Sequence, residues 1–302
     1  MHVAVTGASG LLGKALVASL NAHGHQVSRL VRRPHTRPEE RSEIPWEPLA
    51  GLLDPAHLAG VDAVVHLAGE NVGGGRWSES RKAAIRESRV LGTRTLVDAL
   101  GRMSKPPSVL VSASAIGYYG AAQGDEPLTE AAPPGDDFLA EVCRVWEAEA
   151  QRAERFGVRV VRPRIGIVLD PQGGALEKLL GPYKAGLGGK VGSGRQWMSW
   201  VALPDVVRAF EHALAHTALS GPANVVADGA VTQAEFARTL ARVLGRPSIM
   251  PLPGFAVKAL FGEMGDALLL GGQRVVPAAL RDSGFTFMFP SLEPALRHLL
   301  AK

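Results

Sequence analysis

Short apolar runs alternate along the first half of the chain with longer stretches in which apolar positions recur at helical spacing. The apolar runs predict strands near residues 2–6, 26–31, 62–67, 108–113 and 158–163. The stretches between them predict helices near residues 10–22, 78–100 and 137–156. Strands joined by crossover helices form a parallel sheet that is covered on both faces, so the pattern predicts an α/β fold with a doubly wound sheet. Ligands of such sheets bind at the carboxyl ends of the strands.

The pattern loosens beyond Gly166 into a segment rich in glycine and proline. Further elements are predicted as a helix near 203–216, a strand near 222–227, an extended piece at 248–253 and a helix near 291–301. Thr232 is a predicted helix N-cap. We expect residues 1–165, completed by about 200–227, to form a nucleotide-binding domain. Residues 166–199 and 228–302 would then form a smaller α/β lobe that faces the substrate.

Composition narrows the class of protein. The 302 residues are 46% hydrophobic, which is enough for a large core. The single cysteine, Cys143, excludes an internal disulfide and suits a reducing compartment. The glycine turn begins six residues into the chain, which excludes a signal peptide, and no run reaches the roughly 18 apolar residues of a membrane span. These features predict a cytoplasmic protein with no membrane partner.

The charge balance raises the question of nucleic acid, because the formal charge is +4 and the pI is near 9.4. The basic residues are dispersed, however, and the densest group, between Arg76 and Arg94, also contains Glu79 and Glu87 at helical spacing. We therefore expect no nucleic-acid partner. An anionic cofactor and substrate would explain part of the positive balance.

The first predicted strand leads into Thr6-Gly7-Ala8-Ser9-Gly10-Leu11-Leu12-Gly13, with glycine at every third position. Glycine at these places permits a sharp turn, the approach of a diphosphate to bare backbone, and close packing of helix on strand. The start of the following helix offers free N–H groups to phosphates. A mononucleotide P-loop does not fit, because five residues separate Gly7 from Gly13 and Ala15 follows Lys14. The motif favours a dinucleotide site over a turn that binds nothing.

The end of the second predicted strand indicates which dinucleotide binds. An acidic residue about 20 positions beyond the loop would bind the ribose 2′-hydroxyl of NAD. Here the strand runs into Arg32 and Arg33, and the first acidic residue is Glu39. The sequence therefore predicts NADP, with Arg32 and Arg33 at the 2′-phosphate. The alternative is that both arginines only solvate the end of a strand.

These motifs resemble those of the extended short-chain dehydrogenase/reductase family, which implies a Rossmann-type fold. The resemblance places Gly7, Ser9, Gly10, Leu11 and Leu12 at the cofactor diphosphate. His66-Leu67-Ala68-Gly69 is similar to the family motif beside the adenosine, which implies that Leu67, Ala68 and Gly69 contact the cofactor. Arg89 is a further cofactor contact on the resemblance alone. The segment from Val109 to Gly120 is similar to the one that carries the active-site serine, here Ser114.

More narrowly, several segments resemble the atypical epimerase-family, or sugar-nucleotide-epimerase-like, subgroup. They include Gly69-Glu70-Asn71, Gly74-Gly75-Arg76-Trp77 and Gly192-Ser193-Gly194-Arg195-Gln196-Trp197. The segment from Leu268 onward resembles the small C-terminal domain of unknown function of that subgroup. The resemblance covers essentially the whole chain and implies a small-molecule substrate that is sugar-nucleotide-like.

The main departure from the family concerns the catalytic pair. Ordinary members use Tyr-x-x-x-Lys, in which the lysine lowers the tyrosine pKa for proton transfer. None of the three tyrosines has a lysine four residues later, and Cys143 stands roughly at the lysine position. Tyr119, or alternatively Tyr118, beside Ser114 is the predicted proton donor. The tyrosines could equally be packed aromatic residues, and Cys143 a helix-packing residue.

Two functions remain compatible with the sequence. The first is an NADP(H)-dependent oxidoreductase or epimerase with Ser114 and Tyr119 at the nicotinamide. The second is a non-catalytic NADP(H)-binding sensor or structural protein. Family habit suggests a homodimer through the helices near 78–100 and 137–156. No metal site is expected, because His212 and His216 have no third ligand nearby in the sequence.

Overall fold

The computed structural model describes residues 1–32, 42–121 and 124–301. Within these residues, eight parallel strands form one sheet in the order β11-β7-β5-β4-β1-β2-β3, with β6 beside β7. The strands of this sheet are β1 (His2–Thr6), β2 (Gln26–Val31), β3 (Glu43–Pro45), β4 (Ala63–His66), β5 (Val109–Ser112), β6 (Ser114–Ala115), β7 (Arg159–Ile165) and β11 (Gly221–Val225). The strand order reverses between β1 and β4, so the switch point of a doubly wound sheet lies between their carboxyl ends.

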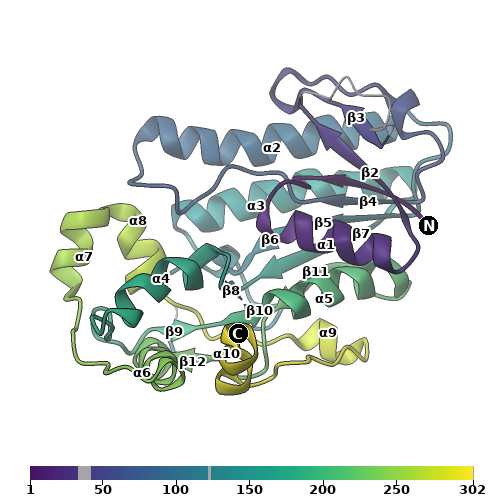
Figure 1. Ribbon diagram of the computed structural model, residues 1–302. Coiled ribbons are helices and arrows are strands. Elements are labelled where there is room, and N and C mark those ends of the chain that lie inside the picture. The colour runs from purple at the N-terminus through teal and green to yellow at the C-terminus, as the bar shows by residue number, and fades with distance from the viewer. Residues whose placement is uncertain (33–41, 122–123, 302) are drawn as a thin grey trace.

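Helices cover both faces of the sheet, as the alternating pattern predicts (Figure 1). One face carries α1 (Leu11–Ala22) and α5 (Leu203–Ala215), and the other carries α2 (Glu79–Gly101) and α3 (Phe138–Gln151). Leu16 and Leu20 of α1 lie one turn apart and are buried against the sheet together with Val206 and Phe210 of α5. The Rossmann-type fold expected from the sequence is therefore confirmed.

The helix boundaries have local causes. Gly24 ends α1 with a φ of +76°, and His25 N–H donates to Leu20 O at 3.0 Å, which together form a Schellman motif. Ser78 and Asp137 are the N-caps of α2 and α3. The helix predicted to reach residue 156 consists of α3 and then the 3₁₀ helix η5 (Arg152–Phe156).

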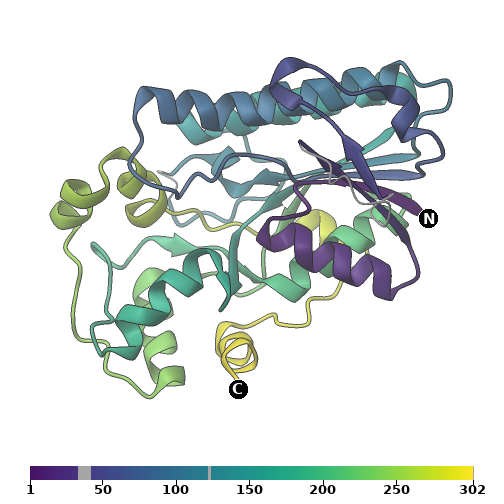
Figure 2. The same ribbon diagram turned by 45° about the horizontal axis from the view of Figure 1, so that its top comes forward.

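The smaller lobe lies at the carboxyl ends of the sheet strands (Figure 2). A second apolar cluster packs here and joins Trp200 to Phe236, Leu240 and Leu296, whereas Phe285 and Phe287 pack in the core of the sheet. Thr232 is the N-cap of α6, as predicted, and its hydroxyl accepts from Glu235 N–H. Apart from α5 and β11, the described elements beyond β7 are β8 (Ile167–Asp170), α4 (Gly174–Lys184), β9 (Trp197–Met198), β10 (Trp200–Ala202), β12 (Val231–Thr232), α6 (Gln233–Leu244), α7 (Gly254–Phe261), α8 (Glu263–Gly265), the π-helical η6 (Asp266–Leu270), α9 (Ala278–Asp282) and α10 (Leu292–Leu300).

Residues 271–276, here called the strap, pass between the sheet and the smaller lobe. Gly272 N–H donates to Ala121 O at 3.0 Å, and Val275 N–H donates to Ser199 Oγ at 2.9 Å. A Cβ on Gly271 would lie 2.5 Å from Ala121 Cβ, and one on Gly272 would overlap Trp197 O. The two glycines are therefore required by the close passage of the strap between two neighbouring segments.

Besides η5, the described residues also form the short 3₁₀ helices η2 (Pro48–Ala50), η3 (Pro55–Leu58) and η4 (Ile116–Tyr119). No helix in the described part of the chain combines the length and the apolar character needed to cross a membrane.

Candidate cofactor site and the polar network beside it

The glycine turn between β1 and α1 lies at the switch point of the sheet. Gly7 has a φ of +67°, and a Cβ there would lie 2.8 Å from Ala68 N. A Cβ on Gly13 would overlap Gly7 O, so this glycine lets α1 pack on the turn. Gly10 differs, because its Cβ would meet only Gly7 O at 3.4 Å. The fold itself therefore requires Gly7 and Gly13, whereas Gly10 leaves open space above exposed backbone.

The open space above Gly10 has the character of an anion site. Ser9 and Gly10 are exposed, and Leu11 and Leu12 are half-buried. No side chain caps the N-terminus of α1, so the first N–H groups of the helix face the opening. Bare backbone at a helix N-terminus fits a diphosphate.

A buried polar chain fixes the end of β4 next to this turn. The Thr93 hydroxyl donates to Arg89 O at 2.6 Å, so it accepts from His66 Nε2 at 3.0 Å. His66 Nδ1 then accepts from the Thr6 hydroxyl at 2.7 Å. Thr6 Oγ1 in turn accepts from the N–H groups of Leu67 and Ala68 at 3.0 and 3.1 Å. These hydrogen bonds hold the predicted adenosine-side segment, Leu67 and Ala68, against Gly7.

This arrangement requires a neutral His66. Burial, and then the charge of Arg89, lowers the pKa of His66 to about 4. The ring is fully buried and donates through Nε2 only, so the network selects one tautomer.

Arg89 of α2 lies beneath the loop that follows β4. Its Nη1 donates to Glu70 O at 2.9 Å and to Ile85 O at 3.1 Å, and its guanidinium lies 5.1 Å from the Trp146 ring. A Cβ on Gly69 would lie 3.2 Å from Arg89 Cζ, so the glycine permits this approach. Burial lowers the pKa of Arg89, and no carboxylate of the described residues forms a salt bridge with it. Arg89 is a half-buried cation at the edge of the sheet where ligands bind.

The predicted 2′-phosphate residues are only partly described. Arg32 is exposed directly after β2, which lies beside β1 at the same edge of the sheet as the glycine turn. Arg33 and Glu39 lie outside the described residues.

Ser114 lies in β6 and is buried beside a charged pair. Its hydroxyl donates to Glu147 Oε1 of α3 at 2.7 Å. Arg164 of β7 holds both oxygens of the same carboxylate, with Nε 2.8 Å from Oε1 and Nη2 3.0 Å from Oε2. Burial opposes the charge of Arg164, but Glu147 raises its pKa above the ordinary value. The Ser114 hydroxyl hydrogen therefore points to a carboxyl group that Arg164 also binds.

Tyr119 reaches the same network from the other side. Its side chain is fully buried, and its hydroxyl donates to Asn224 Oδ1 at 2.7 Å while it accepts from Arg164 Nη1 at 3.0 Å. Burial raises the pKa of Tyr119 to about 12. Tyr118 is half-buried, and the Arg164 guanidinium stacks 3.4 Å from its ring centroid. The structure thus brings Ser114 and Tyr119 together through Arg164 and Glu147.

The region that would carry the family's Tyr-x-x-x-Lys pair is apolar here. Phe138 lies edge-to-face against Trp77, with ring centroids 5.2 Å apart. Cys143 is buried, and burial followed by the charge of Glu147 raises its pKa to about 12. A thiol that stays protonated is not a nucleophile, and it does not supply the positive charge of the family's lysine.

Other candidates have structural partners. Gln196 Nε2 donates to Val191 O and Leu269 O, and Trp197 Nε1 donates to Asp125 Oδ1 at 2.8 Å. The rings of His212 and His216 stack with centroids 4.9 Å apart. The described residues contain no group of three or more potential metal ligands.

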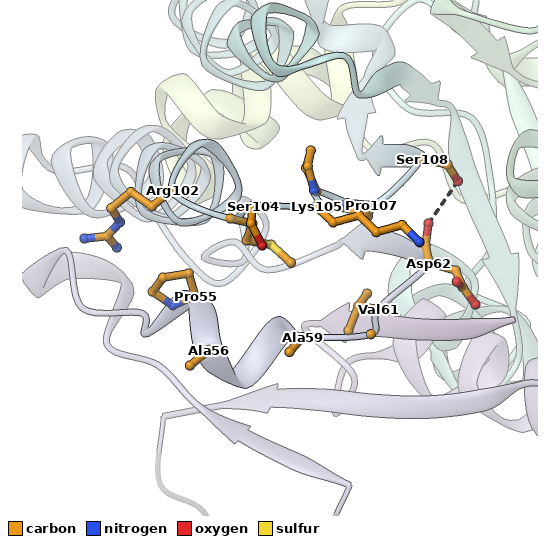
Figure 3. A pocket seen from close by; sticks show the side chains of 13 residues that line it. Pro55, Ala56, Ala59, Val61, Asp62, Arg102, Ser104, Lys105, Pro107 and Ser108 are labelled. Atoms are coloured by element: carbon orange, nitrogen blue, oxygen red, sulfur yellow. Dashed lines mark hydrogen bonds between the residues drawn. The ribbon is translucent and has the colours of Figure 1, made fainter.

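The groove in Figure 3 lies at the opposite end of the sheet. Asp62 and Ser108, which precede β4 and β5, line it, and the Ser108 hydroxyl donates to Asp62 O at 3.0 Å. Lys105 also lines this groove. The glycine turn, Arg89 and Ser114 contribute nothing to it.

Sequence reasoning did not identify Glu147, Arg164 or Asn224 as part of the site. Arg164 carries a usable signal, because a charged residue within an otherwise apolar strand requires a buried partner. The identity of that partner depends on how α3 packs on β7 and is not visible in the sequence.

Comparisons with known proteins match two family models and several relatives. The model of the NAD dependent epimerase/dehydratase family matches residues 3–227, and that of a domain of unknown function, DUF1731, matches residues 252–299. The chain is 43% identical over 294 residues to "Epimerase family protein Mb2239" of Mycobacterium bovis, covering 97% of this chain and 96% of the relative.

Two solved structures extend the comparison. The crystal structure of human epimerase family protein SDR39U1 (isoform 2) with NADPH is 36% identical, with a TM-score of 0.89 and 99% of both chains covered. MoeE5 in complex with UDP-glucose and NAD is 25% identical, with a TM-score of 0.74, and the match covers 98% of this chain and 96% of MoeE5.

Proposed function

The chain belongs to the NAD dependent epimerase/dehydratase family, and from this premise we propose that it is an NADP(H)-dependent oxidoreductase or epimerase. The observation that carries the proposal is the glycine turn. At Gly10 the packing of the fold does not require glycine, yet the backbone is exposed and the N-terminus of α1 has no side-chain cap. Human SDR39U1, solved with NADPH, supports the choice of cofactor. When bound, a nicotinamide cofactor supplies or accepts the hydride.

We assign the diphosphate to Gly7, Ser9, Gly10, Leu11 and Leu12, and the adenosine side to Leu67, Ala68 and Gly69. Arg32 and Arg33 are assigned to the 2′-phosphate. Arg89 is assigned as a cofactor contact, which its burial supports. Removing a guanidinium partly from water without a carboxylate partner among the described residues is unfavourable, and an anionic ligand would offset that cost.

The smaller lobe faces the substrate in this proposal, and the substrate is sugar-nucleotide-like. MoeE5, solved with UDP-glucose, supports that class.

A cytoplasmic location agrees with the unpaired thiol of Cys143. A homodimer through α2 and α3 is also proposed, although their outer faces already carry ion pairs within the chain, such as Arg94–Glu149 and Arg152–Asp98. Size-exclusion chromatography with light scattering would test the dimer by measuring the mass of the protein in solution.

Calorimetric titration with NADPH, NADP, NADH and NAD tests the cofactor assignment. We expect selective binding of the phosphorylated pair. Arg32→Asp should shift the preference toward NAD, because a carboxylate repels the 2′-phosphate and accepts a hydrogen bond from the 2′-hydroxyl. Lys105→Asp, which reverses an exposed charge at the other end of the sheet, is the matched control. An unchanged NADP/NAD ratio in Arg32→Asp would remove the assignment.

For catalysis we propose Ser114 and Tyr119 as the polar pair at the nicotinamide. Arg164 supports this role, because it links the two side chains and carries a permanent charge beside the phenol oxygen. Tyr119→Phe should abolish turnover while NADPH still binds. Full activity in this variant would contradict the assignment.

A specific observation favours a second candidate, an NADP(H)-binding protein that turns over little or nothing. Both hydroxyls donate to buried acceptors, and the pKa of Tyr119 is about 12, which opposes its use as an acid near neutral pH. This candidate predicts tight NADPH binding with negligible oxidation against a broad carbonyl panel. It also predicts partner affinity that differs between reduced and oxidised cofactor. Robust turnover of one physiological carbonyl would exclude it.

A further inference from the structure

The net positive charge of the chain belongs to the residues of the smaller lobe. Residues 166–199 and 228–302 contain 12 Lys and Arg against 8 Asp and Glu, which accounts for the whole net charge of +4. Several cations of this part are paired with carboxylates, including Arg242 with Glu293 and Arg281 with Asp228. The excess of positive charge in this part therefore comes from cations that have no such partner.

Two segments of the lobe lie side by side and collect these cations. Residues 184–190 begin at the last residue of α4, and residues 246–250 lie between α6 and α7 (Figure 1). Met250 N–H donates to Gly188 O at 3.1 Å and Leu252 N–H to Lys190 O at 2.9 Å. Lys184, Lys190 and Arg246 are exposed here, and none has a carboxylate of the described residues within salt-bridge distance. We call residues 184–190 and 246–250 together the basic edge.

Large apolar side chains project from the same two segments. Leu187 is 59% exposed, Ile249 is 73% exposed and Met250 is 52% exposed. Single exposed apolar residues are ordinary, but three on adjoining segments between unpaired cations form a patch that combines apolar and positive surface.

We propose that the basic edge docks on an anionic lipid surface. Lys184, Lys190 and Arg246 would approach the headgroups, while Leu187, Ile249 and Met250 would enter the boundary between headgroups and acyl chains. The patch stands apart from the glycine turn and from Arg89, so the proposal does not depend on the proposed cofactor. A surface attachment of this kind needs no helix that crosses the membrane, and the described residues contain no helix long and apolar enough to do so.

The charge pattern argues against a second copy of the chain as the occupant. In a symmetric dimer the same patch would face itself, and its cations would oppose one another. The apolar side chains also project from a turn and an extended segment, which suits insertion between lipids better than recognition of an acidic peptide.

Co-sedimentation with vesicles tests the proposal. The protein should bind vesicles of phosphatidylcholine mixed with phosphatidylglycerol, but not vesicles of phosphatidylcholine alone, and binding should weaken as salt is added. Each of Lys184→Glu, Lys190→Glu and Arg246→Glu should lower the partition coefficient by about fivefold or more. Ile249→Asp should lower it by about tenfold.

Two control variants make the same kinds of change outside the basic edge. Leu49→Asp removes a side chain that is 62% exposed on the sheet domain, and Lys105→Glu reverses an exposed charge at the far end of the sheet. Both should bind vesicles like the parent chain, and all variants should keep the parent melting temperature and NADPH affinity. Absence of binding to the anionic vesicles at low salt would overturn the proposal, as would binding that the basic-edge variants do not change. Preferential binding of polyglutamate, or a dimer that Ile249→Asp dissociates, would also overturn it.

Discussion

At the scale of single residues, Gly10 and Gly13 separate cofactor binding from folding. A Cβ on Gly13 would overlap Gly7 O, whereas one on Gly10 would meet that oxygen at an ordinary 3.4 Å. Gly13→Ala should therefore destabilise the fold by about 1–3 kcal/mol. Gly10→Ala should change stability by less than about 0.5 kcal/mol.

The same pair of variants tests the diphosphate position by calorimetry with NADPH. Gly10→Ala should weaken binding by roughly tenfold or more, because a methyl group would hold the phosphates away from the N–H groups. Unchanged NADPH affinity in a folded Gly10→Ala protein would contradict the position assigned to the diphosphate.

A second prediction at this scale concerns how stability depends on pH, because the hydrogen bonds of His66 need its neutral ring. The pKa of His66 is about 4 in the folded chain, below its ordinary value of 6.5. Between these values the unfolded chain binds the extra proton, so stability from this residue is present above pH 6.5 and is lost as the pH falls toward 4. The loss amounts to roughly 3 kcal/mol.

Denaturant unfolding of the parent and of His66→Asn between these pH values measures that loss. The variant should be less stable at neutral pH, and its stability should depend less steeply on pH. His57→Asn, which changes an exposed ring, is the control and should keep the parent slope. Parallel pH curves for the parent and His66→Asn would contradict the role given to the ring.

At the scale of elements, the Glu147–Arg164 pair joins α3 to β7 and reaches β6 through Ser114. Both side chains of the pair are nearly fully buried, so removal of one leaves a buried charge without its partner. Glu147→Gln should destabilise the chain by about 3–5 kcal/mol. Glu147→Leu combined with Arg164→Met should cost less than the two single changes together.

Thermal unfolding measures these changes, and Arg94→Met provides the comparison. Arg94 pairs with Glu149 between α2 and α3 but is 48% exposed, so its loss should cost less than about 1 kcal/mol. Equal costs for Glu147→Gln and Arg94→Met would show that burial does not set the strength of the pair.

The accuracy of the sequence predictions also differs between elements. The five strands predicted from apolar runs are present, because each is long enough and buried enough to leave a clear pattern. Strands of two or three residues, such as β6 and β9, are too short to show a period of two. The glycine turn could be predicted because its requirements are local. The buried network could not, because Glu147 and Arg164 meet only once α3 packs on β7.

At the scale of the whole molecule, the strap ties the C-terminal part to the segment after η4 and to the residue between β9 and β10. Residues 252–299 match DUF1731, and the strap bonds this part to Ala121 and Ser199. Since a Cβ on Gly272 would overlap Trp197 O, Gly272→Ala must displace the strap or Trp197. We expect a loss of about 1–3 kcal/mol in stability.

The displacement should also loosen the C-terminal part, so a protease should release it sooner from Gly272→Ala than from the parent chain. Gly181→Ala is the matched control, because a Cβ there has no neighbour within 4 Å and alanine favours the helix interior of α4. That variant should be at least as stable as the parent. If Gly272→Ala instead melts and resists protease like the parent, the close passage of the strap is not what holds the C-terminal part in place.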